Sequence, residues 1–332
     1  MVSVTDREIG RMKFSYWFSG IAFVVFLVAL FFFIHSCVLP DVPTIPPQFT
    51  DTSLFLTAVL NTTGTPQEDI SGITVPHHLL ARDLIADTFL LASHGLYGRV
   101  VVVSPDHYNL GDTDISLSSR DFGTVFGDLT TDQLTVKKLG KFSYVSTSDF
   151  FYREHGIQAI LPFVKYYFPK AQIIAVTFKE GTDKKELDEF VDLLEAVLDR
   201  ETLIVQSTDF SHYLPVEVAN TRDKETISVI KSGDPQKIFS LHQPANLDSI
   251  AAQYIQSRLQ RDLYGATPHV TGHKNSQDYT EEKLAKTTSY ITQVYLVDSS
   301  KLNRAVARGV TFGGFFEGFV QKYGQVFYAC AL

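Results

Sequence analysis

The sequence predicts an α/β domain with a central, mostly parallel or mixed sheet flanked by helices and preceded by one transmembrane helix. Apolar, β-branched runs at residues 98–105, 171–178 and 202–207 have the composition of strands that are buried on both faces. Amphipathic runs at residues 183–199 and 247–265 alternate with these strands and have helical periodicity. Alternating strands and helices are typical of a covered parallel sheet. The membrane helix follows from an uncharged apolar run near the N-terminus.

That apolar run occupies residues 16–34 and contains no charged side chain. About 20 apolar residues are enough for a helix to cross a bilayer. Arg7, Arg11 and Lys13 precede the run, so the positive-inside rule places the N-terminus in the cytoplasm. We therefore expect residues 1–13 to be cytoplasmic, residues 14–36 to be a single-pass anchor in the cell membrane, and the main domain to be extracytoplasmic. The alternative is a cleaved signal peptide, although no A-x-A site precedes Cys37.

The remaining chain divides by composition. Residues 37–50 are rich in proline and predict an extended linker. Residues 51–300 form the α/β domain, with a late strand at 287–297 and a helix that Gly265 closes. The net charge of −8 and the lack of a Lys/Arg run beyond the N-terminus argue against a nucleic-acid partner. Cys37 and Cys330 are too far apart in sequence to form a metal-spaced pair.

Polar side chains follow three of the predicted strands. His77 and His78 come after residues 71–76, His107 after residues 98–106, and Asp209 and His212 after residues 202–207. A single histidine in such a place usually satisfies a hydrogen bond, but imidazoles at three strand ends predict a shared site. Ligands in open α/β sheets collect at the carboxyl ends of strands. A shared metal requires the His77 and His107 ring nitrogens to lie within roughly 8 Å, because metal–nitrogen bonds are only about 2 Å long.

A fourth stretch adds Glu154 and His155 before an apolar helical run. Taken alone, it has a plain structural explanation. A carboxylate at the start of a helix complements the helix dipole, and the histidine next to it would lie on the surface.

In chain order these stretches resemble the Memo family, also called AmmeMemoRadiSam system protein B. The similar motifs are "VPHHLLARD", "VVVVSPDHYNLG", "FGTVFGDLTTD", "REHGIQAILPF", "LIVQSTDFSHY" and "HKNSQDYT" followed by "TTSYITQVYL". The resemblance spans about residues 70 to 298, and six motifs in one order make it specific. It implies a fold like the catalytic subunit of class III extradiol dioxygenases.

The resemblance also implies a redox metal, iron or copper, with His77 and His107 at the first two ligand positions. Glu154, His155, Asp209 and His212 fall on the family's other pocket positions. The family's third ligand is a cysteine, and Ala245 stands in its place here. Asp248 is the nearest replacement in sequence, with Asp209 and Glu154 as the other carboxylate candidates, and a two-histidine, one-carboxylate set suits Fe(II). The alternative is that Asp248 caps the helix that comes after it.

The expected function is therefore a membrane-anchored, metal-binding domain with a small-molecule or peptide ligand. If the domain is an enzyme, its metal would hold O2 or an anionic substrate. His155 or His212 would then act as acid or base, with Asp209 and Glu154 in the same pocket. The alternative is a non-catalytic extracytoplasmic binding module that kept the fold and lost the metal site.

The C-terminal extension, residues 301–332, looks like the opening of a CapA-type poly-γ-glutamate synthesis domain. Phe315 stands where that domain has an aspartate. Because about thirty residues are too few to bury a core, the simpler expectation is a strand and helix packed on the main domain. A truncated second domain is the alternative.

Overall fold

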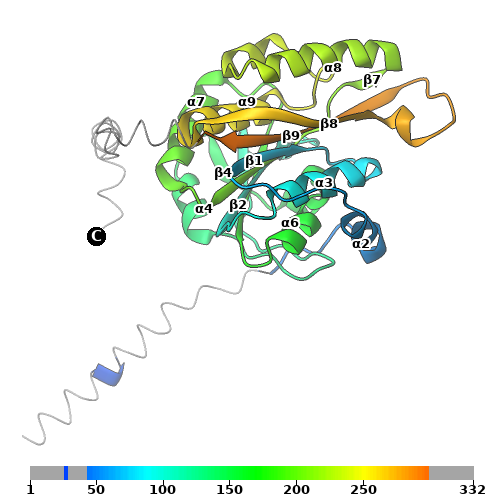
Figure 1. Cartoon of the computed structure of the whole chain (residues 1–332). Helices are drawn as coiled ribbons and strands as arrows, with labels where there is room; N and C mark the ends of the chain where they lie inside the picture. Colours follow the sequence, from blue (N-terminus) through cyan, green and yellow to red (C-terminus); the bar gives the residue numbers. More distant parts are fainter. Residues whose placement is uncertain (1–25, 29–42, 299–332) are drawn as a thin grey trace, which may run out of the picture. The chain divides into compact units, whose positions relative to one another are not determined.

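The computed structural model describes residues 26–28 and 43–298 of the chain (Figure 1). The chain divides into two units, residues 1–43 and residues 44–332. In the first unit, residues 26–28 are helical. No helix among the described residues is both long enough and apolar enough to cross a membrane. The predicted anchor lies outside the described residues except for residues 26–28, and the C-terminal extension lies outside them entirely.

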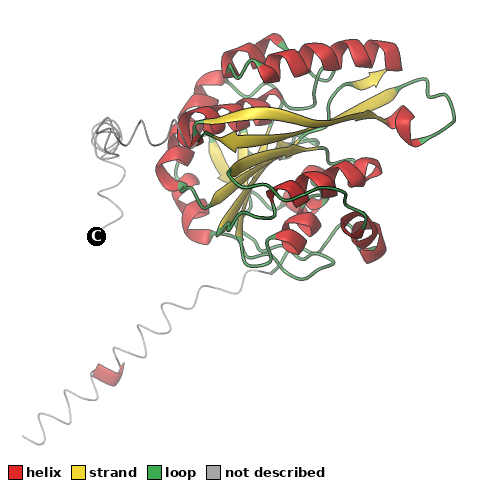
Figure 2. Cartoon of the chain, viewed as in Figure 1, coloured by secondary structure: helices red, strands yellow, loops and turns green. Residues whose placement is uncertain are grey.

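The second unit is built on a mixed sheet of nine strands (Figure 2). Eight strands follow the order β4-β3-β5-β2-β6-β1-β9-β7, and β8 pairs with β9. Strands β5, β2, β6 and β1 are parallel to one another and form the centre, while β3 and β9 run antiparallel beside them. The strands are β1 (Ile70–Val75), β2 (Arg99–Pro105), β3 (Ile115–Leu117), β4 (Val145–Thr147), β5 (Gln172–Phe178), β6 (Thr202–Ser207), β7 (His212–Leu214), β8 (Ala266–Asn275) and β9 (Thr287–Val297).

Helices cover both faces of this sheet, as the continuous apolar strands predict. Alternate residues of β2 point to opposite faces: Val100 and Val102 belong to one core cluster, and Val101 and Val103 belong to the other. The first cluster lies beneath α2 (Thr52–Leu60), α3 (Arg82–Ala92) and α6 (Leu161–Tyr167). The second lies beneath α4 (Gln133–Leu139), α7 (Lys184–Val197) and α9 (Ile250–Leu259). The α/β fold with a mixed, covered sheet is thus confirmed.

Local sequence signals explain the ends of several helices. Asp183 accepts a hydrogen bond from the Lys185 amide and begins α7. Gly265, at φ +63°, ends the turn after α9, as the sequence predicted. The remaining helical elements are η1 (Leu79–Ala81), η2 (Phe150–Tyr152), α5 (His155–Gln158), α8 (Val216–Lys231), η3 (Pro235–Ser240), η4 (Gln260–Tyr264) and η5 (Ser276–Tyr279).

The described end of the predicted linker packs against the domain. Ile45 is fully buried, and its backbone bonds to Asp121 and Gly123. The packed unit therefore includes the end of the proline-rich segment, because an isoleucine in that segment fills a place in the core.

Candidate metal site

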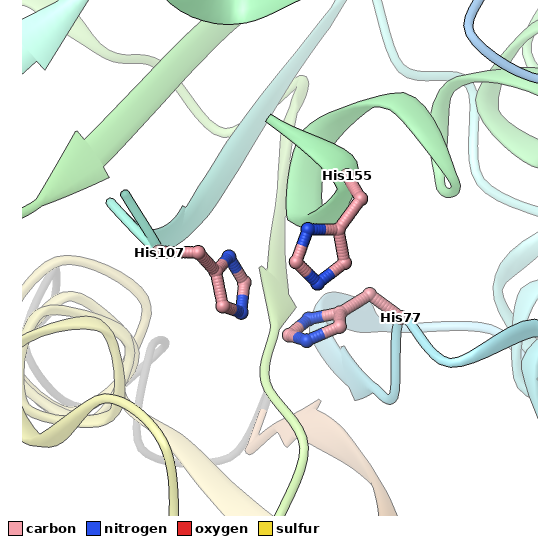
Figure 3. A group of neighbouring side chains, drawn as sticks. All are labelled: His77, His107 and His155. Carbon is pink, nitrogen blue, oxygen red and sulfur yellow. The ribbon is translucent and has the colours of Figure 1, made fainter. Parts of the chain in front are cut away.

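Three histidines meet at one edge of the sheet (Figure 3). His77 follows β1, His107 follows β2, and His155 begins α5. Strands β1 and β2 are both parallel neighbours of β6, so their carboxyl ends lie at the same edge. One ring nitrogen from each histidine lies within 4.8 Å of those of the other two. This separation is well inside the limit set by a shared metal, so the three imidazoles could hold one ion.

Hydrogen bonds fix how His77 presents its ring. Ser207 donates its hydroxyl proton to the Gly156 carbonyl at 2.5 Å. Its oxygen can then only accept from His77 Nδ1, which lies 3.2 Å away. His77 therefore carries a proton on Nδ1 and directs Nε2 into the site. This is the orientation that a metal-binding imidazole needs.

His107 is held in the same manner by a buried carboxylate. Glu154 is fully buried, and its Oε1 lies 2.6 Å from His107 Nδ1. The same carboxylate also accepts the backbone amides of His107 at 3.0 Å and Gly156 at 2.9 Å. Glu154 therefore both begins α5, as a helix-start carboxylate should, and orients His107. The Nε2 atom of His107 is left facing the site.

His155 is the most exposed of the three, and its side chain is 33 % accessible. The Tyr108 hydroxyl lies 3.4 Å from its Nδ1. Its ring is 4.0 Å from that of His107 and 5.1 Å from that of His77, measured between centroids. The sequence predicted an acid or base here, and the structure adds His155 to the metal-ligating candidates.

Asp248 lies against two of the histidines. Its Oδ2 is 3.2 Å from His77 Nε2 and 3.7 Å from His107 Nε2. The neighbouring Ser249, rather than Asp248, caps α9 by accepting the Ala252 amide. Asp248 Oδ1 is buried and has no hydrogen-bond partner among the described residues. The helix-cap interpretation of Asp248 is therefore wrong, and a buried carboxylate oxygen is left for a cation.

Asp209 holds the turn that carries His77 and His78 by hydrogen bonds to its backbone. Its Oδ1 accepts the amides of His77 at 3.0 Å and His78 at 3.4 Å. Its own amide donates to Asp248 Oδ2 at 3.1 Å, and the Asp248 amide donates back to the Asp209 carbonyl. This reciprocal pair ties the segment after β6 to the loop before α9. Asp209 therefore positions His77 and Asp248, and its Oδ2 also lies 3.7 Å from His77 Nε2.

Two other histidines of the motifs point elsewhere. His212 Nδ1 bonds to the Phe210 carbonyl. No polar contact within the described part of the chain joins His212 to the three clustered histidines. His78 bonds through Nδ1 to the Tyr290 hydroxyl at 2.5 Å and stacks on that ring. The structure thus brings together His77, His107, His155, Glu154, Asp209 and Asp248, and leaves His212 outside these contacts.

The carboxylates control the protonation of the histidines. Burial alone would lower the pKa of His77, but Asp209 and Asp248 outweigh it and raise the pKa. Burial likewise opposes the charge on His107, but hydrogen bonds to Asp248 and Glu154 raise its pKa to about 10. Burial opposes ionisation of Asp248 as well, yet His77 and His107 hold the pKa of this carboxyl low. Without a metal, a proton therefore occupies the His107 nitrogen that a metal would bind at neutral pH.

His155 has the opposite behaviour. Burial, together with the charges on His107 and His77, lowers its pKa to about 3. It is neutral at physiological pH, so it offers a lone pair without first losing a proton.

Cavity size does not identify this site. A cavity of about 370 Å³ lies beside α2 and α3, lined by residues that include Arg82, Asp83 and Tyr279. It contains none of the three histidines. The cluster is identified by its chemistry, namely convergent imidazoles with a buried carboxylate behind them.

The sequence profile of the family described as "Memo-like protein" matches residues 49–292. The chain belongs to the Memo-like family. The matched region contains every residue of the histidine site, so the site lies within the family's shared domain.

Curated relatives are described as MEMO1 family proteins. The chain is similar to a MEMO1 family protein of Pyrobaculum aerophilum, 26 % identical over 46 % of this chain and 55 % of the relative. A MEMO1 family protein of Methanothermobacter thermautotrophicus is 25 % identical over 62 % of this chain and 81 % of its own. One from Aquifex aeolicus is 31 % identical over 53 % and 50 % respectively. The matches to the first two relatives each cover 55 % of those proteins.

Among solved structures, the chain is similar to an uncharacterized protein of Escherichia coli K12. The TM-score is 0.43 at 10 % identity, covering 67 % of this chain and 99 % of that one. A likeness at this level identifies neither a function nor a site.

Proposed function

We propose that this Memo-like chain binds one divalent redox metal, iron(II) or copper, through His77, His107 and His155, with Asp248 beside them. The observation that supports it is the orientation of the rings. His77 and His107 are each held through Nδ1, by Ser207 and Glu154, so that their Nε2 atoms face Asp248. Imidazole and carboxylate ligands suit iron and copper, and the buried, unpartnered Asp248 oxygen fits a cation.

The residues around the proposed metal have separate roles. A bound metal of this kind would supply Lewis acidity and one-electron chemistry. Glu154 keeps the proton of His107 on Nδ1, and Ser207 does the same for His77. Asp209 holds the backbone of the His77 turn in place. His155 lies beside the Tyr108 hydroxyl at the more exposed side, where an incoming molecule would meet it. We also propose that a metal held at this centre supports dioxygenase-like chemistry.

Glu154→Gln tests the orienting role of the carboxylate. The amide keeps the size of the side chain but removes the charge that fixes the His107 tautomer. Loss of such an outer partner costs about 10–100-fold in metal affinity, and we expect a loss of that size. Equilibrium titration with iron(II) and copper measures it. Glu68→Gln, at an exposed carboxylate that pairs with the exposed His94, is the matched control. Equal affinities in the two variants would contradict the role given to Glu154.

A non-catalytic binding module is the second candidate. One observation favours it: His77 Nε2 lies 3.2 Å from Asp248 Oδ2, so a protonated His77 can pair with this carboxylate in place of a metal. Electron paramagnetic resonance separates the two candidates. The redox proposal predicts that bound iron or copper cycles between two oxidation states when oxidant and reductant are added. A protein that takes up no such metal, or only zinc, would favour the binding module.

We further propose that residues 14–36 anchor this domain in the cell membrane with the histidine site on the extracytoplasmic side. The support is the uncharged run at residues 16–34 and the basic residues that precede it. The full chain should stay with the membrane fraction through high-salt and alkaline washes. A C-terminal reporter should be active only outside the cytoplasm. Recovery of a soluble protein that begins near Asp41 would instead indicate a cleaved signal peptide.

A further inference from the structure

One cation lies at the edge of the histidine site without a carboxylate partner. Arg153 is exposed, and its guanidinium lies 5.6 Å from the centre of the Tyr108 ring. Within residues 43–298, it forms no ion pair. By contrast, other arginines do pair with carboxylates: Arg99, Arg120, Arg222, Arg258 and Arg261. An arginine held over an aromatic ring keeps its donors free for a ligand.

The Tyr108 ring joins this arginine to the site. Its hydroxyl lies 3.4 Å from His155 Nδ1, and its ring centroid is 6.0 Å from that of His155. The same ring is 45 % exposed. Arg153 and His155 are therefore both within reach of one small molecule that lies across Tyr108.

The charge around the histidines limits which anion can bind. The buried carboxylates of Glu154 and Asp209 and the partly buried carboxylate of Asp248 contact the cluster. Positive charge on His77 and His107, or on a bound divalent metal, offsets at most two of these three charges. A dianion such as phosphate would therefore meet a remaining negative charge with a single guanidinium to balance it. A carboxylate carries one charge and matches the planar fork of arginine with two parallel hydrogen bonds.

We propose that Arg153 is a specificity-determining residue that binds the carboxylate of a small monoanionic molecule, whose other end reaches the histidine cluster across Tyr108. The inference rests on the proposed function only in what the far end of this molecule meets, namely a metal at the histidine cluster. Binding of the carboxylate itself depends on Arg153 and Tyr108, which are not metal ligands in that proposal.

The test uses benzoate as the probe, benzamide as its uncharged counterpart, and inorganic phosphate as the dianion. Calorimetric titrations compare the unmodified chain with Arg153→Gln, Arg153→Lys and Arg200→Gln. The Arg200→Gln control removes another exposed arginine, one that precedes the amino end of β6, opposite the edge that carries the histidines. Each titration is run on protein of measured metal content, with and without added iron(II).

We expect Arg153→Gln to weaken benzoate binding about tenfold or more, because hydrogen bonds to charged groups are among the stronger ones. Arg153→Lys should recover part of the loss, since it keeps the charge but not the fork. Arg200→Gln should leave the affinity unchanged. Benzamide should bind more weakly than benzoate and should not respond to Arg153→Gln. Unchanged thermal unfolding of Arg153→Gln shows that the variant is folded.

Three results would overturn the inference. They are equal benzoate affinity with and without Arg153, tighter Arg153-dependent binding of phosphate than of benzoate, and no benzoate binding at about 10 mM. The metal content separates this inference from the proposed function. If protein that holds metal binds benzoate equally well with and without Arg153, the carboxylate site is contradicted and the metal site is not. If the protein takes up no metal but its benzoate binding still depends on Arg153, the metal site is contradicted and the carboxylate site is not.

Discussion

His107→Ala is expected to lose metal binding and to destabilise the fold. The substitution removes a proposed ligand, so metal affinity should fall by more than the roughly 10–100-fold cost of losing an outer-shell partner. It also leaves the fully buried Glu154 without its charged partner, although two backbone amides still donate to that carboxylate. Removing one member of a buried pair costs about 3–5 kcal/mol, and we expect a value near the lower end. Denaturant unfolding and metal titration measure the two effects.

His94→Ala is the matched control. His94 is an exposed histidine whose Nδ1 lies 3.8 Å from Oε1 of the exposed Glu68. It should leave both stability and metal binding unchanged. If His107→Ala behaved like this control, the buried pair and the ligand role would both be contradicted.

The second large effect is the dependence of metal affinity on pH. Metal binding requires neutral imidazoles, and the pKa of His107 without metal is about 10. A metal must therefore displace a proton from His107 at neutral pH. Affinity should rise about tenfold per pH unit for each proton displaced, between about pH 6 and pH 8. Competition titrations across this range measure the slope, and a flat profile would contradict the proton-occupied site.

The stability of the metal-free protein should change in the opposite direction. The folded-state pKa of His107, about 10, lies above its ordinary value of 6.5. The charged pair therefore stabilises the fold fully below about pH 6.5, and this contribution is lost as the pH rises through about 10. The difference in unfolding free energy between the unmodified chain and His107→Ala should shrink over this range, because the variant lacks the titrating group.

Much of the fold could be predicted because the apolar runs in the sequence coincide with strands that are buried in the structure. The apolar runs became the central parallel strands, and parallel strands bring the residues at their carboxyl ends to one edge of the sheet. His77 and His107 were predicted to converge for that reason. Strand β8 was harder to predict than β9, because its sequence, ATPHVTGHKN, has few apolar residues. Its position is set by pairing with β9 from Ala266 to Asn275.

The rest of the site could not be predicted from local sequence. Glu154 is both a helix-start carboxylate and the partner of His107, so its local explanation hid its second role. His155 follows directly and was assigned to acid–base chemistry instead of the ligand set. Asp248 matched a helix cap by position, but Ser249 provides the cap. His212 shares a motif with Asp209, yet backbone bonding turns its ring to the Phe210 carbonyl.

The most direct test of the central claim is metal analysis of the chain, purified without chelators and supplied with iron(II), copper and zinc in turn. The unmodified chain is compared with the His77→Ala/His107→Ala double variant. The proposal predicts close to one iron or copper ion per chain, and almost none in the double variant. Equal metal content in the two proteins, or none in either, would contradict a metal site built on these histidines.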